Sequence, residues 1–232
     1  MKLDFFGPEF LSALLAIIVI DLVLAGDNAI VIAMAARNLP PHLQKKAIIW
    51  GAVGAIAVRS FMTLIVVYLL GIPGLMFIGG ALLVWIAYKL LKPAANEGAG
   101  QDHAANTFWG AMKTIVIADA VMGLDNVLAV AGAAGGSYLL VVIGLLISIP
   151  IVVWGSTLIL KLVDRYPSII YFGAAVLAFT AGKMMTSEPM VQAWLDSVSM
   201  SLEYVVQAVV ILGVLVAGYA QSKVSPKKSA AV

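Results

Sequence analysis

The chain has 232 residues, of which 62% are hydrophobic and 11% charged, and its mean hydropathy is +1.05. Ordinary soluble domains have roughly 45–50% apolar and about 25% charged residues, so this composition excludes that class and indicates a polytopic helical membrane protein. The formal net charge of +2 is too small to indicate a nucleic-acid partner, and the absence of cysteine excludes disulfides, zinc–thiolate sites and thiol catalysis.

Apolar stretches of about 20 residues, separated by charged residues, Gly and Pro, predict membrane-spanning helices. In chain order, the seven predicted spans cover residues 9–36, 46–70, 72–92, 109–134, 138–161, 167–187 and 200–221. Together they predict one transmembrane domain over residues 1–221. Residues 222–232 hold three lysines and are predicted to form a basic, disordered tail near anionic lipid headgroups.

The basic residues predict how the chain is oriented in an inner (plasma) membrane. With the N-terminus outside and the C-terminus in the cytoplasm, the outer face keeps only Lys2 and Lys183. The inner face then collects eleven basic residues, namely Arg37, Lys45, Lys46, Lys89, Lys92, Lys113, Lys161, Arg165, Lys223, Lys227 and Lys228.

The sequence contains an internal repeat. The segment Asp21-Leu-Val-Leu-Ala-Gly-Asp27-Asn28 returns 98 residues later as Asp119-Ala-Val-Met-Gly-Leu-Asp125-Asn126. A second pair of similar segments, 77–91 and 171–185, is offset by 94 residues.

These matches divide the chain into two units, residues 9–92 and 109–189, joined by the linker 93–108 and followed by an extra helix at 200–221. Because each unit has an odd number of spans, the second unit must be inverted in the membrane. We therefore predict an all-α fold with an inverted 3+3 repeat and one C-terminal helix, an architecture typical of secondary transporters.

The four repeated aspartates lie inside predicted spans, where each carboxylate costs roughly 2.5–3.5 kcal/mol on insertion scales. Residues six apart on a regular helix point about 120° apart and are separated by about 9 Å along the axis. Both aspartates of a pair can therefore face one site only if the helix is broken, and Gly26 and Gly123 are the predicted hinges. The alternative is a continuous helix in which each aspartate serves a different site.

The repeated polar residues are hard oxygen donors, which suit Mg²⁺, Ca²⁺ or Mn²⁺. The candidate ligands are Asp21, Asp27, Asn28, Asp119, Asp125 and Asn126. Met122 could add a soft thioether and favour Mn²⁺, although packing in the core is the commoner role of such a residue. Four ionised aspartates exceed the charge of one divalent ion, so either some are protonated, which would couple metal to protons, or Arg59 acts as a counter-ion.

The twin Asp-x5-Asp-Asn motifs within seven predicted spans resemble the TerC family of integral membrane proteins, and the similarity covers about residues 9–221. The resemblance implies divalent-metal homeostasis, chiefly manganese efflux. It also implies that the acidic and amide residues of both motifs, together with Arg59, are the matched site positions.

The sequence thus favours a secondary transporter, not an enzyme, with Mn²⁺ as transported substrate, no cofactor, the lipid bilayer as its surroundings and homo-oligomerisation left open. One alternative is a partner that delivers metal to secreted enzymes without transporting it. Another is an intramembrane aspartyl protease, since such enzymes use paired carboxylates. Four duplicated aspartates exceed what a catalytic dyad needs, which argues against the protease.

Overall fold

The computed structural model describes residues 7–70, 72–91, 107–134, 137–198 and 202–224. All regular structure in these ranges is helical, as predicted. The helices are α1 (Pro8–Ala36), α2 (Pro41–Leu70), α3 (Leu75–Leu91), α4 (Phe108–Ala133), α5 (Tyr138–Arg165), α6 (Ile169–Thr186), α7 (Pro189–Val198) and α8 (Leu202–Val224).

Seven of these helices match the predicted spans with small shifts at their ends. Helix α8 continues to Val224, so the first three residues of the predicted disordered tail are helical. The rest of that tail and most of the predicted linker, residues 92–106, lie outside the described residues. Helix α7 was not predicted.

Length and hydropathy allow four of the described helices to cross a bilayer, namely α2, α5, α6 and α8. Helix α1 makes a fifth span if its two segments, Phe10–Leu22 and Gly26–Ala36, are taken together. Helix α3 is apolar but has only 17 residues. The seven predicted spans are therefore supported for four or five helices, and the remainder stay a prediction.

Local hydrogen bonds explain where several helices begin. The hydroxyl of Thr107 accepts a hydrogen bond from the Gly110 amide at 3.1 Å, which caps α4, and Ser137 caps α5 in the same way. Helix α3 is capped from a distance, because the buried carboxylate of Glu188 accepts hydrogen bonds from the amides of Gly74 (2.7 Å) and Met76 (3.2 Å). Glu188 therefore joins the end of α6 to the start of α3.

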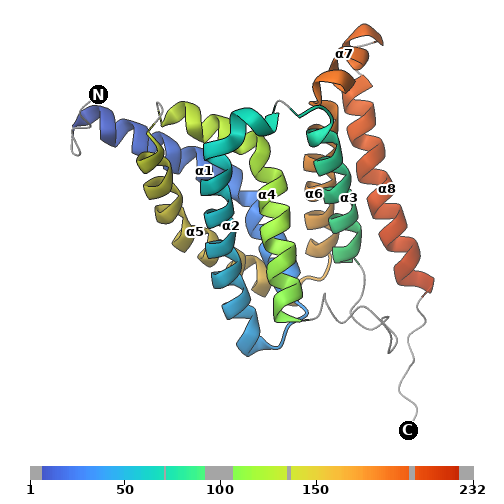
Figure 1. Ribbon diagram of the computed structural model, residues 1–232. Helices are drawn as coiled ribbons and strands as arrows, with labels where there is room; N and C mark the ends of the chain where they lie inside the picture. Colours follow the sequence, from blue (N-terminus) through green and yellow to red (C-terminus); the bar gives the residue numbers. More distant parts are fainter. Residues whose placement is uncertain (1–6, 71, 92–106, 135–136, 199–201, 225–232) are drawn as a thin grey trace.

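The helices pack in a regular pairing (Figure 1). Helix α1 lies along α5, α2 lies along α4, and α3 lies beside α6, with α8 packed on the outer side of α6. Most of the described basic residues lie near helix termini at one end of the bundle in Figure 1. The C-terminus of α3 and the N-terminus of α4 are among these termini.

Glycines allow close approach at the main helix contacts. A Cβ at Gly51 of α2 would lie 2.7 Å from the Ile115 side chain of α4, and one at Gly144 of α5 would collide with Ile17 of α1. Small residues let helix backbones approach in this way in membrane proteins. Close packing of an isoleucine side chain on a glycine therefore holds both the α2–α4 pair and the α1–α5 pair together.

Replacing Gly80 with alanine should destabilise the contact between α3 and α6. The added Cβ would lie 2.7 Å from the carbonyl oxygen of Ala181, a backbone atom that cannot move aside alone. We expect a cost of about 1–3 kcal/mol, seen as a lower unfolding temperature of the detergent-solubilised protein. Gly213→Ala is the matched control, since a Cβ there meets no atom within 4 Å. Equal midpoints for both variants would contradict the packing argument.

Helix α7 is a short amphipathic element at one end of the bundle (Figure 1). Met190, Trp194 and Val198 recur at every fourth position and are exposed, whereas Leu195 is buried. An exposed apolar stripe that includes tryptophan is typical of a helix lying in the membrane interface.

Candidate functional site

Arg59 joins the two copies of the aspartate motif. It lies on α2, and its Nη1 donates a hydrogen bond of 2.6 Å to Oδ1 of Asp21 on α1. Its Nη2 donates to Oδ1 of Asp119 on α4. All three side chains are buried, with exposed fractions of 3–5%. The first aspartates of the two motifs, 98 residues apart in the sequence, therefore share one guanidinium.

Gly123 of α4 lies beside the Arg59 side chain. A Cβ at this position would lie 3.6 Å from Nε and 3.9 Å from Cγ of Arg59, so the arginine side chain runs directly beside the α4 backbone. A methyl group at this position would make an ordinary van der Waals contact with the arginine.

Asp27 belongs to the same electrostatic cluster but makes different contacts. It is half-buried, and its Oδ1 accepts a hydrogen bond of 2.9 Å from the Asn28 amide. Arg59 acts on it electrostatically, and the hydroxyl of Thr180 on α6 lies within hydrogen-bonding reach. Asp119 also feels the charges of Asp21 and Asp27. Three carboxylates thus surround one cation.

Thr180 was not predicted as a site residue. The signal in the sequence was one of two threonines in a largely apolar, glycine-containing helix, which is common enough to carry little information. Only the packing of α6 against α1 brings it to Asp27.

Helix α1 is bent at the motif. The segments Phe10–Leu22 and Gly26–Ala36 meet at 49°, so Gly26 begins the second segment. Helix α4 also changes direction in Figure 1, where its last part turns away toward the start of α5. The predicted hinge at Gly26 therefore coincides with the bend of α1, whereas the hinge at Gly123, which lies beside Arg59, stays a prediction.

Two oxygens near this cluster have no hydrogen-bond donor among the described residues. They are Oδ1 of Asn28 and Oδ2 of Asp119, and both are buried. Buried polar atoms are usually satisfied, so each of these oxygens can accept a cation or a hydrogen bond, and the Asp119 carboxylate can also take up a proton.

The remaining predicted ligands are less informative. Met122 is buried among apolar side chains of the core that includes Leu83 and Leu177, which is a packing position. Asn126 is half-buried, and the side chain of Asp125 lies outside the described part. No group of three or more acidic or histidine side chains in the described residues is arranged to hold a metal ion. Arg59 instead pairs with Asp21 and Asp119, two of the predicted ligands.

The sequence matches the Integral membrane protein TerC family over residues 6–227. The chain belongs to the TerC family. It is therefore an integral, multi-pass membrane protein, and the resemblance seen in its aspartate motifs is confirmed.

Several relatives in bacteria are similar to this TerC-family chain. The uncharacterized membrane protein YjbE of Bacillus subtilis (strain 168) is 45% identical over 180 residues, which cover 78% of this chain and 82% of YjbE. The uncharacterized membrane protein YkoY of the same organism is 27% identical over 69% of this chain and 55% of its own length. The UPF0053 protein YegH of Escherichia coli (strain K12) is 27% identical over 70% of this chain, but the match spans only 34% of YegH. No solved structure matches the chain.

Proposed function

We propose that this protein is a secondary transporter that exports a hard divalent cation, Mn²⁺ first among them, from the cytoplasm through the site around Arg59. The observation that carries the proposal is the shared ion pairing of Asp21 and Asp119 with Arg59. A buried ionisable cluster inside a membrane protein marks an ion or substrate path by default.

The charge of the cluster suits a divalent substrate. When Asp21, Asp27 and Asp119 are all ionised, the single guanidinium of Arg59 leaves two negative charges of the cluster uncompensated. One divalent cation would balance them. The donors are carboxylate and amide oxygens, which favour Mg²⁺, Ca²⁺ and Mn²⁺ over softer metals.

Arg59 would act as an internal cation during transport. In the described conformation it holds both Asp21 and Asp119, so a metal ion must displace the guanidinium from at least one of them. We propose that this conformation is the substrate-free one, and that metal or protons exchange with Arg59 as the site changes its exposure.

The helix packing supports an inverted repeat, which would let the site change the side of the membrane to which it is exposed. Ile17 of α1 packs against Gly144 of α5, and Ile115 of α4, 98 residues after Ile17, packs against Gly51 of α2. Exchanging α1 with α4 and α2 with α5 turns one contact into the other. Two halves related in this way can alternate around a central site. We further propose the plasma membrane as location, with the N-terminus outside.

Neutralising the second aspartate of the first motif, Asp27, should abolish transport. We expect cells that express Asp27→Asn to lose Mn²⁺ efflux, because a hard donor near Arg59 is removed while shape is kept. Mn²⁺ retained by loaded cells measures the effect, with membrane abundance determined by blot. Asp164→Asn, an exposed residue at the end of α5, is the matched control and should keep wild-type efflux. Asp125→Asn extends the test to the second repeat.

Liposomes that contain only the purified protein separate transport from metal delivery. Mn²⁺ flux in these vesicles would support a transporter, and comparison with Ca²⁺ and Mg²⁺ would rank the substrates. Absence of flux for all three ions in wild-type vesicles would overturn the proposal.

A further inference from the structure

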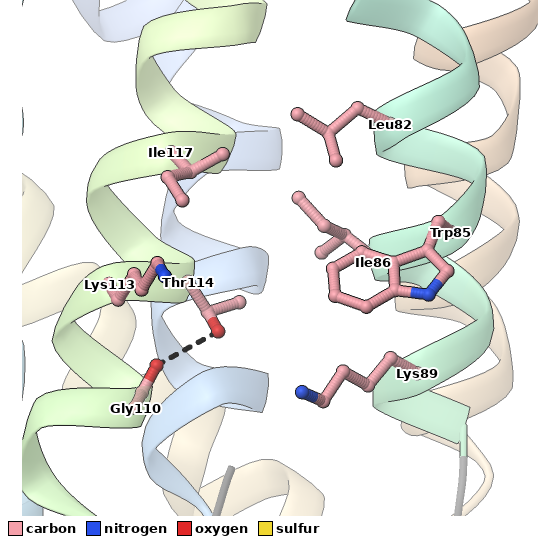
Figure 2. A pocket seen from close by; sticks show the side chains of 8 residues that line it. All are labelled: Leu82, Trp85, Ile86, Lys89, Gly110, Lys113, Thr114 and Ile117. Carbon is pink, nitrogen blue, oxygen red and sulfur yellow. Dashed lines mark hydrogen bonds between the residues drawn. The ribbon is translucent and has the colours of Figure 1, made fainter. Parts of the chain in front are cut away.

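A second polar feature lies away from the aspartates, in a pocket of about 150 Å³ between α3 and α4. Figure 2 shows its two walls, with Trp85 and Lys89 from α3 on one side and Lys113 and Thr114 from α4 on the other. The remaining lining residues are Leu82, Ile86, Gly110 and Ile117.

The pocket is cationic at one end. Lys89 is half-buried in the last turn of α3, and in Figure 2 its ammonium group extends toward α4. Its Nζ lies 5.2 Å from the centre of the Trp85 ring, a cation–π distance that holds the side chain beside the pocket. Lys113 is exposed in the second turn of α4. None of the described residues that line the pocket is acidic, so they do not balance the charge of the two lysines.

The other end of the pocket is apolar. Leu82, Ile86 and Ile117 continue the lining along the helices away from the lysines, as Figure 2 shows. A soluble anion would gain nothing from these side chains. A molecule with an anionic head and a hydrocarbon chain matches both ends at once.

The position along the bundle agrees with this chemistry. Lys89 and Lys113 lie where α3 ends and α4 begins, at the end of the bundle in Figure 1 that carries most described basic residues. Half-exposed Trp85 lies one turn before Lys89, and amphipathic tryptophan rings are enriched at the level of lipid headgroups. Basic pockets between transmembrane helices are known to bind anionic headgroups.

We propose that this pocket binds an anionic phospholipid. The phosphate of the lipid lies between the ammonium groups of Lys89 and Lys113, and one acyl chain follows Leu82, Ile86 and Ile117. The bound lipid bridges the last helix of the first predicted repeat and the first helix of the second. This site is independent of the cation site and of the proposed transport.

Titration of the detergent-solubilised protein with phosphatidylglycerol, followed by native mass spectrometry, tests the site. Each lysine near an anionic lipid is worth enough to change affinity about fivefold, so Lys89→Gln or Lys113→Gln should weaken binding about fivefold and the double variant about thirtyfold. The double Lys→Arg variant keeps both charges and should keep most of the affinity. Phosphatidylcholine should bind the wild type weakly.

Three controls make the outcome decisive. Lys161→Gln removes an exposed lysine of α5 and should leave the affinity unchanged. Equal weakening by Lys161→Gln would show nonspecific surface charge and overturn the proposal, as would full affinity of the Lys89→Gln/Lys113→Gln double variant. Displacement of the lipid by inorganic phosphate alone would show a site for the free anion, which also overturns it. Unchanged elution volume and unfolding midpoint establish that each variant is folded.

Discussion

Replacing Arg59 with methionine is expected to destabilise the folded protein by about 3–5 kcal/mol, the usual cost of removing one partner from a buried ion pair. Methionine fills a similar volume but leaves Asp21 and Asp119 buried without their shared cation. Each carboxylate must then be protonated or drag water into the bundle. The contacts along Gly123 would be kept in part, so the loss is chiefly electrostatic.

The unfolding midpoint of the purified protein in detergent measures this effect, with a decrease of roughly 6–20 °C expected for a chain of this size. Arg165→Met is the matched control, because Arg165 is an exposed arginine at the end of α5 that lies near the Tyr166 ring. Arg59→Lys should be intermediate, since an ammonium keeps the charge but lacks the planar fork that reaches two carboxylates. If Arg59→Met and Arg165→Met unfold at the same temperature, the buried pairs do not stabilise the fold.

The helices could be predicted because their signal is local. A run of apolar residues long enough to cross a bilayer is visible in any window of the sequence, and breaks such as Pro40-Pro41 end the run. The repeat was visible for the same reason, since polar residues stand out against an apolar background. The family assignment rested on these residues and is confirmed by the comparison over residues 6–227.

Contacts between distant segments could not be predicted. From the sequence, Glu188 would be placed as a charged residue in a loop on the outer face. In the structure it is buried and caps a helix more than 100 residues earlier in the chain. The sequence also could not say which of four aspartates Arg59 would meet. That choice depends on how α1, α2 and α4 rotate against one another, and the structure selects the first aspartate of each motif.

The two halves of the site also differ more than the motif suggests. Ala25-Gly26 in the first motif stands where the second has Gly123-Leu124. A Cβ at Gly26 would meet no atom within 4 Å, whereas one at Gly123 would be in van der Waals contact with Arg59. Equivalent roles for the two glycines therefore do not follow from the repeated motif alone.

Removing all three charges at once should separate stability from transport. In the triple variant Asp21→Asn, Arg59→Met, Asp119→Asn, both ion pairs are removed whole, because their carboxylates and the guanidinium are gone. The half-buried Asp27 loses the nearby charge of Arg59 but keeps its hydrogen bond from the Asn28 amide. Replacement of a whole buried ion cluster by neutral side chains is often close to neutral for stability. We expect the triple variant to recover most of the unfolding temperature that Arg59→Met loses.

Transport should not recover with it. Mn²⁺ efflux from cells expressing the triple variant is expected to fall to the level of cells without the protein, since the two oxygen donors shared by the repeats have lost their charge. A stable, abundant and inactive triple variant would show that the buried charges are kept for handling the ion and not for holding the fold. If the triple variant transports Mn²⁺ normally, Asp21 and Asp119 are not ligands, and the site must be sought around Asp27, Thr180 and the second motif's Asp125.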